Sequence, residues 1–367
     1  MEIILTIVIF IVVLGLVVYV HELGHFLAAK RAGVAVEEFG FGFPPRLFSK
    51  QWRGTLYSIN AIPLGGFVKI KDFGREEEFT KETKEAQDAA DGFSSQSLPR
   101  KLWIVVAGIV MNCLLAVVIF TTVFLIGYET PAQMSQSGGA LLSQNVIVQG
   151  VMDGKPAQAA GLQAGDRIMT AQGMSISKTV DLNNILENSL DTPIHITLLR
   201  DKTIINTSVT PTLLDSDLIG IGISTVDVEK KRYPIHLALW QGVRETWFFT
   251  SLIAGLLWNF FSSLVTSSAT DTSNFQGPVG IATTLHSIAE LGAVQLLYAA
   301  GTISINVALF NLLPLPLLDG GKIWLLLIEA VRGKPLPLRV EALIYNVTFL
   351  LFIGLMILLT VRDIHQL

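Results

Sequence analysis

Long apolar runs alternate with polar stretches along this chain, and several runs are long enough to cross a lipid bilayer. The three clearest runs cover residues 3–28, 102–126 and 342–361. A spanning helix needs about 20 apolar residues, and each run approaches or exceeds that length. A fourth run, residues 292–318, is weaker because two asparagines and two prolines interrupt it. Interrupted helices are tolerated at membrane depth where they line a protein interior or a wet cavity. The pattern therefore predicts a polytopic α-helical membrane protein with about four transmembrane helices.

The segment between the second and fourth runs has a different pattern. Residues 146–148 and 194–199 have strand character, Arg200-Asp201-Lys202 is typical of a hairpin turn into residues 203–209, and residues 180–190 have helical spacing. Residues 155–168 resemble the PDZ pattern, in which a short helix and a glycine turn lead into a strand. We expect one inserted α/β PDZ domain; the alternative is another small α/β domain.

Residues 235–270 are rich in tryptophan and phenylalanine, interspersed with Arg244, Glu245 and Asn259. Aromatic amphipathic stretches lie in the membrane interface. A fifth spanning helix around residues 246–265 is the alternative. The distribution of Lys and Arg disfavours an extra crossing, because it would place the basic link near residue 335 outside the cell.

Composition agrees with a membrane protein. The 367 residues are 51% hydrophobic and 15% charged, and the mean hydropathy is +0.54. A net charge of −4 gives no basic footprint for nucleic acid. The single cysteine, Cys113, excludes an intramolecular disulfide and a cysteine zinc site. The first run lacks a basic leader and a small-residue cleavage pattern, so we expect it to be retained.

Basic residues predict the orientation. They gather between the first two runs (Lys30, Arg31, Arg46, Lys50, Arg53, Arg100 and Lys101) and in the link before the last run (Arg332, Lys334 and Arg339). Such loops are cytoplasmic by the positive-inside rule. Both termini and the long connection of residues 127–290 are then extracytoplasmic. Residues 75–91, which are charged, are predicted to form a solvated cytoplasmic loop or helix.

The first run ends in the pentapeptide His21-Glu22-Leu23-Gly24-His25. Histidines at i and i+4 share one helix face, so both imidazoles can reach one Zn²⁺. Glu22 is placed to take a proton from a water molecule on the metal. Ionisable residues at membrane depth are costly and are functional candidates by default. The alternative is a chance match on a buried helix.

A second motif, Asn311-Leu-Leu-Pro314-Leu-Pro-Leu-Leu318-Asp319-Gly320, lies in the weak fourth run. With His21–His25 in the first run, the chain resembles the site-2 protease family of intramembrane zinc metalloproteases, most closely the bacterial regulator-of-sigma-E protease type. The resemblance covers nearly the whole chain. It implies a divided membrane core (residues 1–126 and 291–367), an extracytoplasmic PDZ domain (127–230) and an amphipathic membrane-interface segment (231–290).

The resemblance implies one Zn²⁺ per chain with Asp319 as the third ligand. Catalytic zinc keeps three protein ligands and one open position. The other histidines, His195, His236, His286 and His365, do not lie in the apolar segments that carry the motifs. An ordinary turn aspartate before Gly320 is the alternative for Asp319.

Further segments match the family by resemblance. Asn306 and Asn311 are expected to hold the substrate backbone or polarise the scissile carbonyl, with helix–helix hydrogen bonding as the alternative. Gly40 and Gly42 lie in a segment that resembles the family's edge strand. Gly65, Gly66, Phe67 and Val68 lie in residues 55–70, which resemble a membrane-reentrant β-loop on the cytoplasmic side; an ordinary hairpin is the alternative.

Two more segments have weaker expectations. The segment Gly277-Pro278-Val279-Gly280 also matches the family, with no chemical role assigned to it. Family PDZ domains are circularly permuted, which would make Gly220, Ile221 and Gly222 the loop that binds a peptide carboxylate. Some relatives of this type carry two PDZ domains, whereas residues 127–290 have room for one.

The resemblance implies an intramembrane zinc endopeptidase of the bacterial inner membrane, with its active site towards the cytoplasmic side. Glu22 would serve as general base and then as general acid. Expected partners are the lipid bilayer and single-span substrates such as anti-sigma factors or remnant signal peptides. A non-catalytic membrane PDZ scaffold is the main alternative. A transporter would need matched inverted halves, and no repeat relates residues 1–126 to 290–367.

Overall fold

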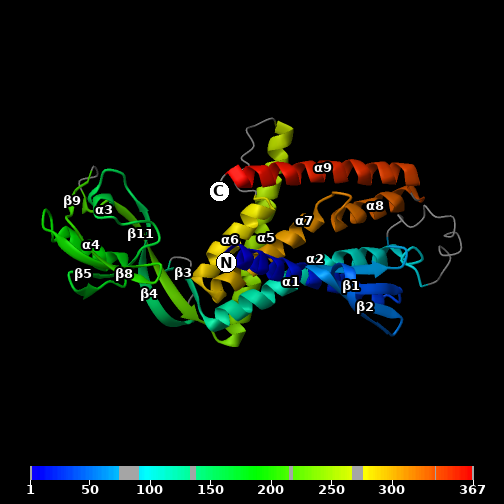
Figure 1. Cartoon of the computed structure of the whole chain (residues 1–367), viewed down its shortest axis with the longest axis horizontal. Helices are drawn as coiled ribbons and strands as arrows, with labels where there is room; N and C mark the ends of the chain where they lie inside the picture. The colour runs from blue at the N-terminus through cyan, green and yellow to red at the C-terminus, as the bar shows by residue number, and fades with distance from the viewer. Residues whose placement is uncertain are drawn as a thin grey trace. The chain divides into compact units, whose positions relative to one another are not determined.

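The structure of the chain is a computed structural model that describes residues 2–73, 91–132, 138–214, 218–266, 276–334 and 336–365. It divides into two compact units (Figure 1). Met1–Thr121 and Leu239–Leu367 form the first, which we call the membrane unit. Thr122–Ala238 form the second, the inserted unit. The predicted loop at residues 75–91 lies almost wholly outside the described residues.

Helices dominate the membrane unit. In chain order its elements are α1 (Glu2–Arg31), β1 (Val36–Trp52), β2 (Thr55–Ile70), α2 (Leu98–Ile126), α5 (Ile235–Thr266), α6 (Pro278–Leu291), α7 (Ala293–Leu312), α8 (Asp319–Arg332) and α9 (Leu338–His365). Within the described residues, α1, α2, α7 and α9 are the helices long and apolar enough to span a membrane. The prediction of about four such helices is confirmed.

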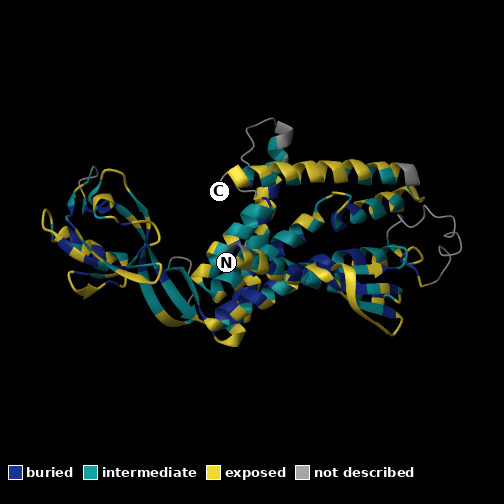
Figure 2. Ribbon diagram, viewed as in Figure 1, coloured by how far each residue is buried: buried dark blue, intermediate teal, exposed yellow. Residues whose placement is uncertain are grey.

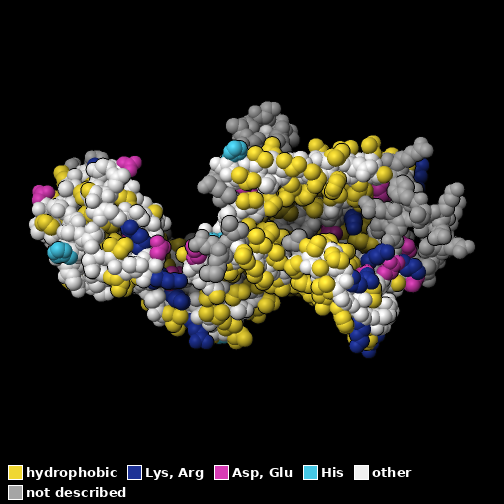
Figure 3. Space-filling view, viewed as in Figure 1, with side chains coloured by type: hydrophobic (Ala, Val, Ile, Leu, Met, Phe, Trp, Pro, Cys, Tyr) yellow, Lys and Arg dark blue, Asp and Glu magenta, His cyan; other side chains and the backbone are white. Residues whose placement is uncertain are grey.

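Helix α9 carries an apolar and highly exposed surface of the membrane unit. Its most apolar stretch has no buried residue, although it has a mean hydropathy of 2.4. Yellow, exposed residues follow the helix in Figure 2, and hydrophobic side chains cover it in Figure 3. Leu343, Leu350 and Leu351 are each more than 60% exposed. Exposing so much apolar surface to water is unfavourable, so we expect lipid or another protein to cover it.

The aromatic segment forms one continuous helix, α5, with 32 residues. It is not among the four helices that meet the length and hydropathy needed for a span. Trp240, Trp247 and Trp258 are exposed along it. The predicted amphipathic segment, residues 231–290, covers α5 and most of α6.

Strands β1 and β2 are long and bent, and each pairs with the other twice. Residues 36–43 of β1 pair with residues 62–70 of β2 on one side and with residues 55–59 on the other. Phe41, for example, lies opposite both Gly66 and Ile59. The expectation that Gly40 and Gly42 lie on an edge strand is therefore wrong, because their segment has a strand on each side. Residues 62–70 form one edge instead, and residues 46–52 form the other.

The inserted unit is built on an antiparallel sheet in the order β3-β11-β4-β5-β7-β8, with β6 beside β5. Its elements are β3 (Tyr128–Pro131), β4 (Ala140–Val151), α3 (Pro156–Ala159), β5 (Arg167–Ala171), β6 (Met174–Ser175), α4 (Thr179–Glu187), β7 (Ile194–Arg200), β8 (Thr203–Val209), β9 (Thr212–Leu213), β10 (Ile219–Gly220) and β11 (Ile223–Arg232). The predicted hairpin turn is confirmed: Asp201 and Lys202 both have positive φ, as a tight two-residue turn requires.

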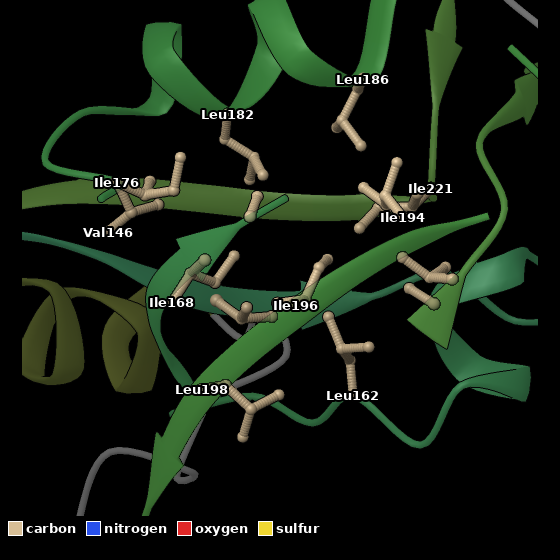
Figure 4. Close-up of a cluster of buried hydrophobic side chains, with 14 residues drawn as sticks. Val146, Leu162, Ile168, Ile176, Leu182, Leu186, Ile194, Ile196, Leu198 and Ile221 are labelled. Atoms are coloured by element: carbon tan, nitrogen blue, oxygen red, sulfur yellow. The ribbon is translucent and has the colours of Figure 1, made fainter. Parts of the chain in front are cut away.

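A dry aliphatic core holds the inserted unit together. Leu182 and Leu186 of α4 face Ile168, Ile194 and other sheet residues, all at most 4% exposed (Figure 4). One charged pair accompanies this core. Asp166 is fully buried and accepts hydrogen bonds from the Arg200 guanidinium at 2.6 and 2.7 Å. The carboxylate raises the pKa of Arg200, so the guanidinium stays charged at neutral pH.

The structure gives the Gly277–Gly280 segment a structural role. Asp363, buried near the end of α9, accepts hydrogen bonds from the backbone N–H groups of Gly277 and Gly280 at the start of α6. A Cβ on Gly277 would lie 2.6 Å from the Asp363 carboxylate. The glycines therefore let a carboxylate from another helix cap α6, whose first N–H groups lack partners within the helix.

We predict that Gly277→Ala lowers the thermal stability of the full-length protein in detergent. The added methyl group displaces Asp363, and loss of such a cap costs about 0.5–2 kcal/mol. Gly354→Ala is the matched control, because a Cβ at that position in α9 meets nothing within 4 Å. Thermal unfolding monitored by intrinsic fluorescence should show a lower midpoint for Gly277→Ala alone. Equal midpoints would remove the capping role.

Candidate metal centre

Helix α1 brings His21 and His25 to one face, and a close helix contact holds that face against α2. Both histidines are buried, at 5% and 3% exposed. Gly24, between them, lies so close to α2 that a Cβ would overlap the carbonyl oxygen of Ala107. The missing side chain therefore sets the separation of the two helices. This close approach brings the imidazole rings into contact with the backbone of α2.

Asp319 reaches the same place because the chain reverses sharply before it. Helix α7 ends at Leu312, and Leu313 is extended, as expected for a residue before proline. The turn then packs onto the first turn of α8. A Cβ on Gly320 would overlap the carbonyl oxygens of Leu312 and Leu313, and one on Gly321 would overlap that of Leu315. Only glycines allow this turn, which leaves Asp319 as the first residue of α8.

Three potential metal donors converge inside the membrane unit. The Nε2 atom of His21 lies 2.8 Å from Oδ2 of Asp319, and Nε2 of His25 lies 3.1 Å from the same oxygen. The two Nε2 atoms are 3.1 Å apart. Among the described residues, this is the group of His, Cys, Asp or Glu side chains close enough to hold one metal ion. The predicted trio is thus brought together across 298 residues.

The surroundings of the trio suit a metal such as zinc. The Nδ1–H of His25 donates to the carbonyl oxygen of Ile104 at 2.8 Å, so its Nε2 keeps a lone pair for a metal. Gly108 lies beside the Nε2 atoms of both rings, where a Cβ would overlap that of His25 and come within 2.8 Å of His21. Two imidazole nitrogens and one carboxylate oxygen form a ligand set found at catalytic zinc sites.

A cavity of about 430 Å³ opens beside the trio. Glu22 lines it next to the two histidines, and Asn311 lines it from α7. Lys322, one turn after Asp319, also lines it and lies over the ring of Phe73, 3.7 Å from the ring centre. The cavity therefore combines three possible metal ligands, a carboxylate, an amide and an ammonium group.

The structure separates the predicted substrate-binding residues into two groups. Phe67 and Val68 line the cavity from the edge segment of β2. Gly65 and Gly66 do not line it but pack against α1, where a Cβ on Gly65 would lie 2.7 Å from Val18. Asn306 also lies outside the lining, and its Nδ2 donates to the carbonyl of Thr302 in its own helix.

Gly220, Ile221 and Gly222 lie in the inserted unit, immediately before β11. Ile221 is buried, and Gly222 has a φ of +79° that favours glycine. The carbonyl oxygens of Ile221 and Gly222 accept hydrogen bonds from Ala157 and Met152. Both carbonyl groups are therefore hydrogen-bonded within the inserted unit.

Sequence reasoning missed the contribution of α2. Ile104, Gly108 and Asn112 are spaced four residues apart, so they lie along one helix face against the two histidines. A glycine and an asparagine at this spacing in an apolar run were the available signal. The backbone carbonyl of Ile104 carries no sequence signal.

Comparisons with known proteins identify the family of this chain. The profile of peptidase family M50 matches residues 9–355. A candidate zinc metalloprotease of Clostridium perfringens is 32% identical over 95% of each chain. The zinc metalloproteases RasP of Geobacillus kaustophilus and Bacillus licheniformis are 28% and 27% identical, over 97% and 99% of each chain. The PDZ domain of an SdrC-like protein from Listeria monocytogenes aligns with 25% of this chain and 90% of its own, at 20% identity and a TM-score of 0.21.

We predict that Gly108→Ala lowers zinc retention at least tenfold, because its methyl group would fill space needed by both imidazoles. Disturbing the groups around metal ligands commonly costs about 10–100-fold in affinity. Zinc measured by elemental analysis after dialysis against a weak chelator provides the test. Gly255→Ala, with no atom within 4 Å of its added Cβ, is the matched control. Normal zinc retention in Gly108→Ala would show that the rings do not need this space.

Proposed function

The chain belongs to peptidase family M50, and on that premise we propose that it is an intramembrane zinc endopeptidase acting in regulated intramembrane proteolysis. It is a site-2-type zinc metalloprotease, with Zn²⁺ as its cofactor. The proposed substrates are single-span membrane proteins, such as anti-sigma factors, or signal-peptide remnants. The observation that carries the proposal is the convergence of His21, His25 and Asp319 beside Glu22 in one cavity.

In this proposal His21, His25 and Asp319 hold one zinc ion through Nε2, Nε2 and a carboxylate oxygen. Zinc held there would make a bound water molecule more acidic and would polarise a carbonyl group. Three lone-pair-bearing atoms within about 3 Å repel one another unless a proton or cation lies between them. A divalent cation also offsets the cost of placing a carboxylate in an apolar environment.

Glu22 is assigned the proton transfers. Its carboxylate takes a proton from the attacking water as the water oxygen forms a bond to the scissile carbonyl carbon. The same carboxyl group then gives that proton to the peptide nitrogen as the C–N bond breaks. One carboxylate thus serves both steps, and Glu22 ends in its starting state. Asn311, with Asn306 as the second candidate, is proposed to donate to the carbonyl oxygen or hold the substrate backbone.

Substrate docking is assigned to the edge segment of β2. A transmembrane helix hides its peptide carbonyls in its own hydrogen bonds, so it must unwind before cleavage. Residues 62–70 pair with β1 on one side, and no strand of the described chain pairs with the other side. An unwound substrate can add there as a new strand, with Phe67 and Val68 presenting it to the cavity.

We place the protein in the bacterial inner membrane, with both termini outside and the active site towards the cytoplasm. The β1–β2 segment is then the membrane-reentrant loop. The inserted unit is proposed to be an extracytoplasmic PDZ domain that binds chain ends at Gly220, Ile221 and Gly222. A scaffold that only binds chain ends is the alternative function, but it gives Glu22 no role beside the metal ligands.

We predict that Glu22→Gln keeps zinc and thermal stability but lowers proteolysis by about 10²–10⁴-fold, as expected for loss of a general base. The amide preserves shape and cannot accept the proton. Cleavage of a single-span substrate in proteoliposomes, with zinc analysis of the same sample, provides the measurement. Glu37→Gln is the control, because Glu37 is exposed and does not line the cavity. Undiminished cleavage by Glu22→Gln would exclude the proposed mechanism.

Strand docking predicts a cross-linking pattern. In a Cys113→Ala, Glu22→Gln protein, Val68→Cys becomes the single cysteine, and a substrate carrying one cysteine is scanned through its transmembrane segment. An extended substrate should form disulfides at every second position, because strand side chains alternate between faces.

Phe48→Cys supplies the control for this experiment. Phe48 is 64% exposed and lies on the segment of β1 that pairs with residues 55–60, away from the edge at Val68. It should give no periodic pattern. A repeat of three to four residues at Val68→Cys would mean that the substrate binds as a helix, contrary to strand docking.

A further inference from the structure

Helix α2 contacts both candidate ligand histidines at Nδ1, the ring nitrogen opposite the Nε2 donor atom. Behind His25, the contact is complete, since Nδ1–H donates to the Ile104 carbonyl at 2.8 Å. Behind His21, Nδ1 lies 3.4 Å from the side-chain amide of Asn112. Asn112 lies two helical turns after Ile104, on the same face. The two histidines thus have equivalent supports from one helix, one from the backbone and one from a side chain.

The Asn112 amide is buried and incompletely bonded. The residue has no exposed surface, and its Oδ1 has no hydrogen-bond partner among the described residues. Its backbone carbonyl accepts a hydrogen bond from Ser304 of α7 at 2.8 Å, which ties this part of α2 to α7. A buried polar atom without a hydrogen-bond partner lowers stability by about 1–3 kcal/mol, so we expect Oδ1 to have a hydrogen-bond donor.

The chemistry of His21 supplies that donor. If Nε2 binds a metal, a neutral imidazole carries its remaining hydrogen on Nδ1. An N–H group at Nδ1 needs an acceptor, and the amide NH₂ cannot provide one. A half-turn of the Asn112 amide exchanges its oxygen and nitrogen, which have nearly the same shape. The oxygen then faces Nδ1–H of His21.

We propose that Asn112 is a positioning residue for the metal site: its Oδ1 accepts a hydrogen bond from Nδ1–H of His21. This bond fixes both the tautomer and the angle of the ring, so that Nε2 points at the metal. The inference rests on the proposed role of His21 as a ligand. Outer groups that orient ligand histidines in this way commonly change metal affinity about 10–100-fold.

The test measures zinc affinity of the full-length protein in detergent, by competition with a chromophoric chelator. Asn112→Leu retains the bulk and removes the acceptor, so zinc should bind about 10–100-fold more weakly. Asn112→Asp retains an acceptor of the same shape, and its affinity should stay at the wild-type value or increase. Ser304→Ala is the matched control, because it removes a buried hydrogen bond to Asn112 without touching His21; it should bind zinc normally.

The outcomes separate this inference from the proposed function. His21→Ala should lose zinc, and full retention would exclude His21 as a ligand and the role of Asn112 with it. Loss in His21→Ala together with wild-type affinity in Asn112→Leu would overturn only the present inference. If Asn112→Leu does not fold, Asn112→Asp decides: affinity at or above wild type supports the bond, and a tenfold loss overturns it. Cobalt substitution adds a second readout, since a turned His21 ring should alter the visible d–d bands in Asn112→Leu but not in Ser304→Ala.

Discussion

Two imidazoles and one carboxylate must lie within about 3 Å of one another in surroundings that oppose charge, and much of the membrane unit is built around this requirement. Gly24 brings α1 against the α2 backbone, and Gly108 leaves room there for both rings. The glycines after Asp319 let α8 begin directly on the end of α7. Small residues at these contacts allow backbones to approach, which is the usual way that helices pack in membranes.

The same geometry relates substrate access to the metal centre. The edge segment of β2 crosses α1 beside Gly15 and Val18, one turn before His21. A Cβ on Gly15 would lie 3.3 Å from the Pro63 carbonyl, so this strand is held close to the helix that carries two candidate ligands. A backbone added to the outer edge of β2 would therefore extend past the cavity. In the proposed mechanism, the scaffold that fixes the histidines also fixes the scissile bond.

Local sequence patterns predicted the four apolar helices, the hairpin turn at Asp201 and the i, i+4 histidines, because each depends on residues close together in the chain. Asp319 needed the family resemblance, since nothing local relates it to His21. The sequence carried only a weak signal for the support from α2, because Ile104 acts through its carbonyl and Gly108 matters only once two helices have packed. The family resemblance placed Gly40 on an edge strand. Sequence alternation could not correct this, because it does not reveal that this part of β1 has a strand on each side.

Zinc K-edge X-ray absorption of the purified full-length protein tests the proposed metal centre most directly. We predict a four-coordinate first shell of nitrogen and oxygen at about 2.0–2.2 Å, with multiple scattering from two imidazoles and no sulfur. The Asp319→Ala protein should retain the two-imidazole signal at lower zinc content. A sulfur shell near about 2.3 Å, or three or more imidazoles, would contradict a site made of His21, His25 and Asp319 with one position open for water.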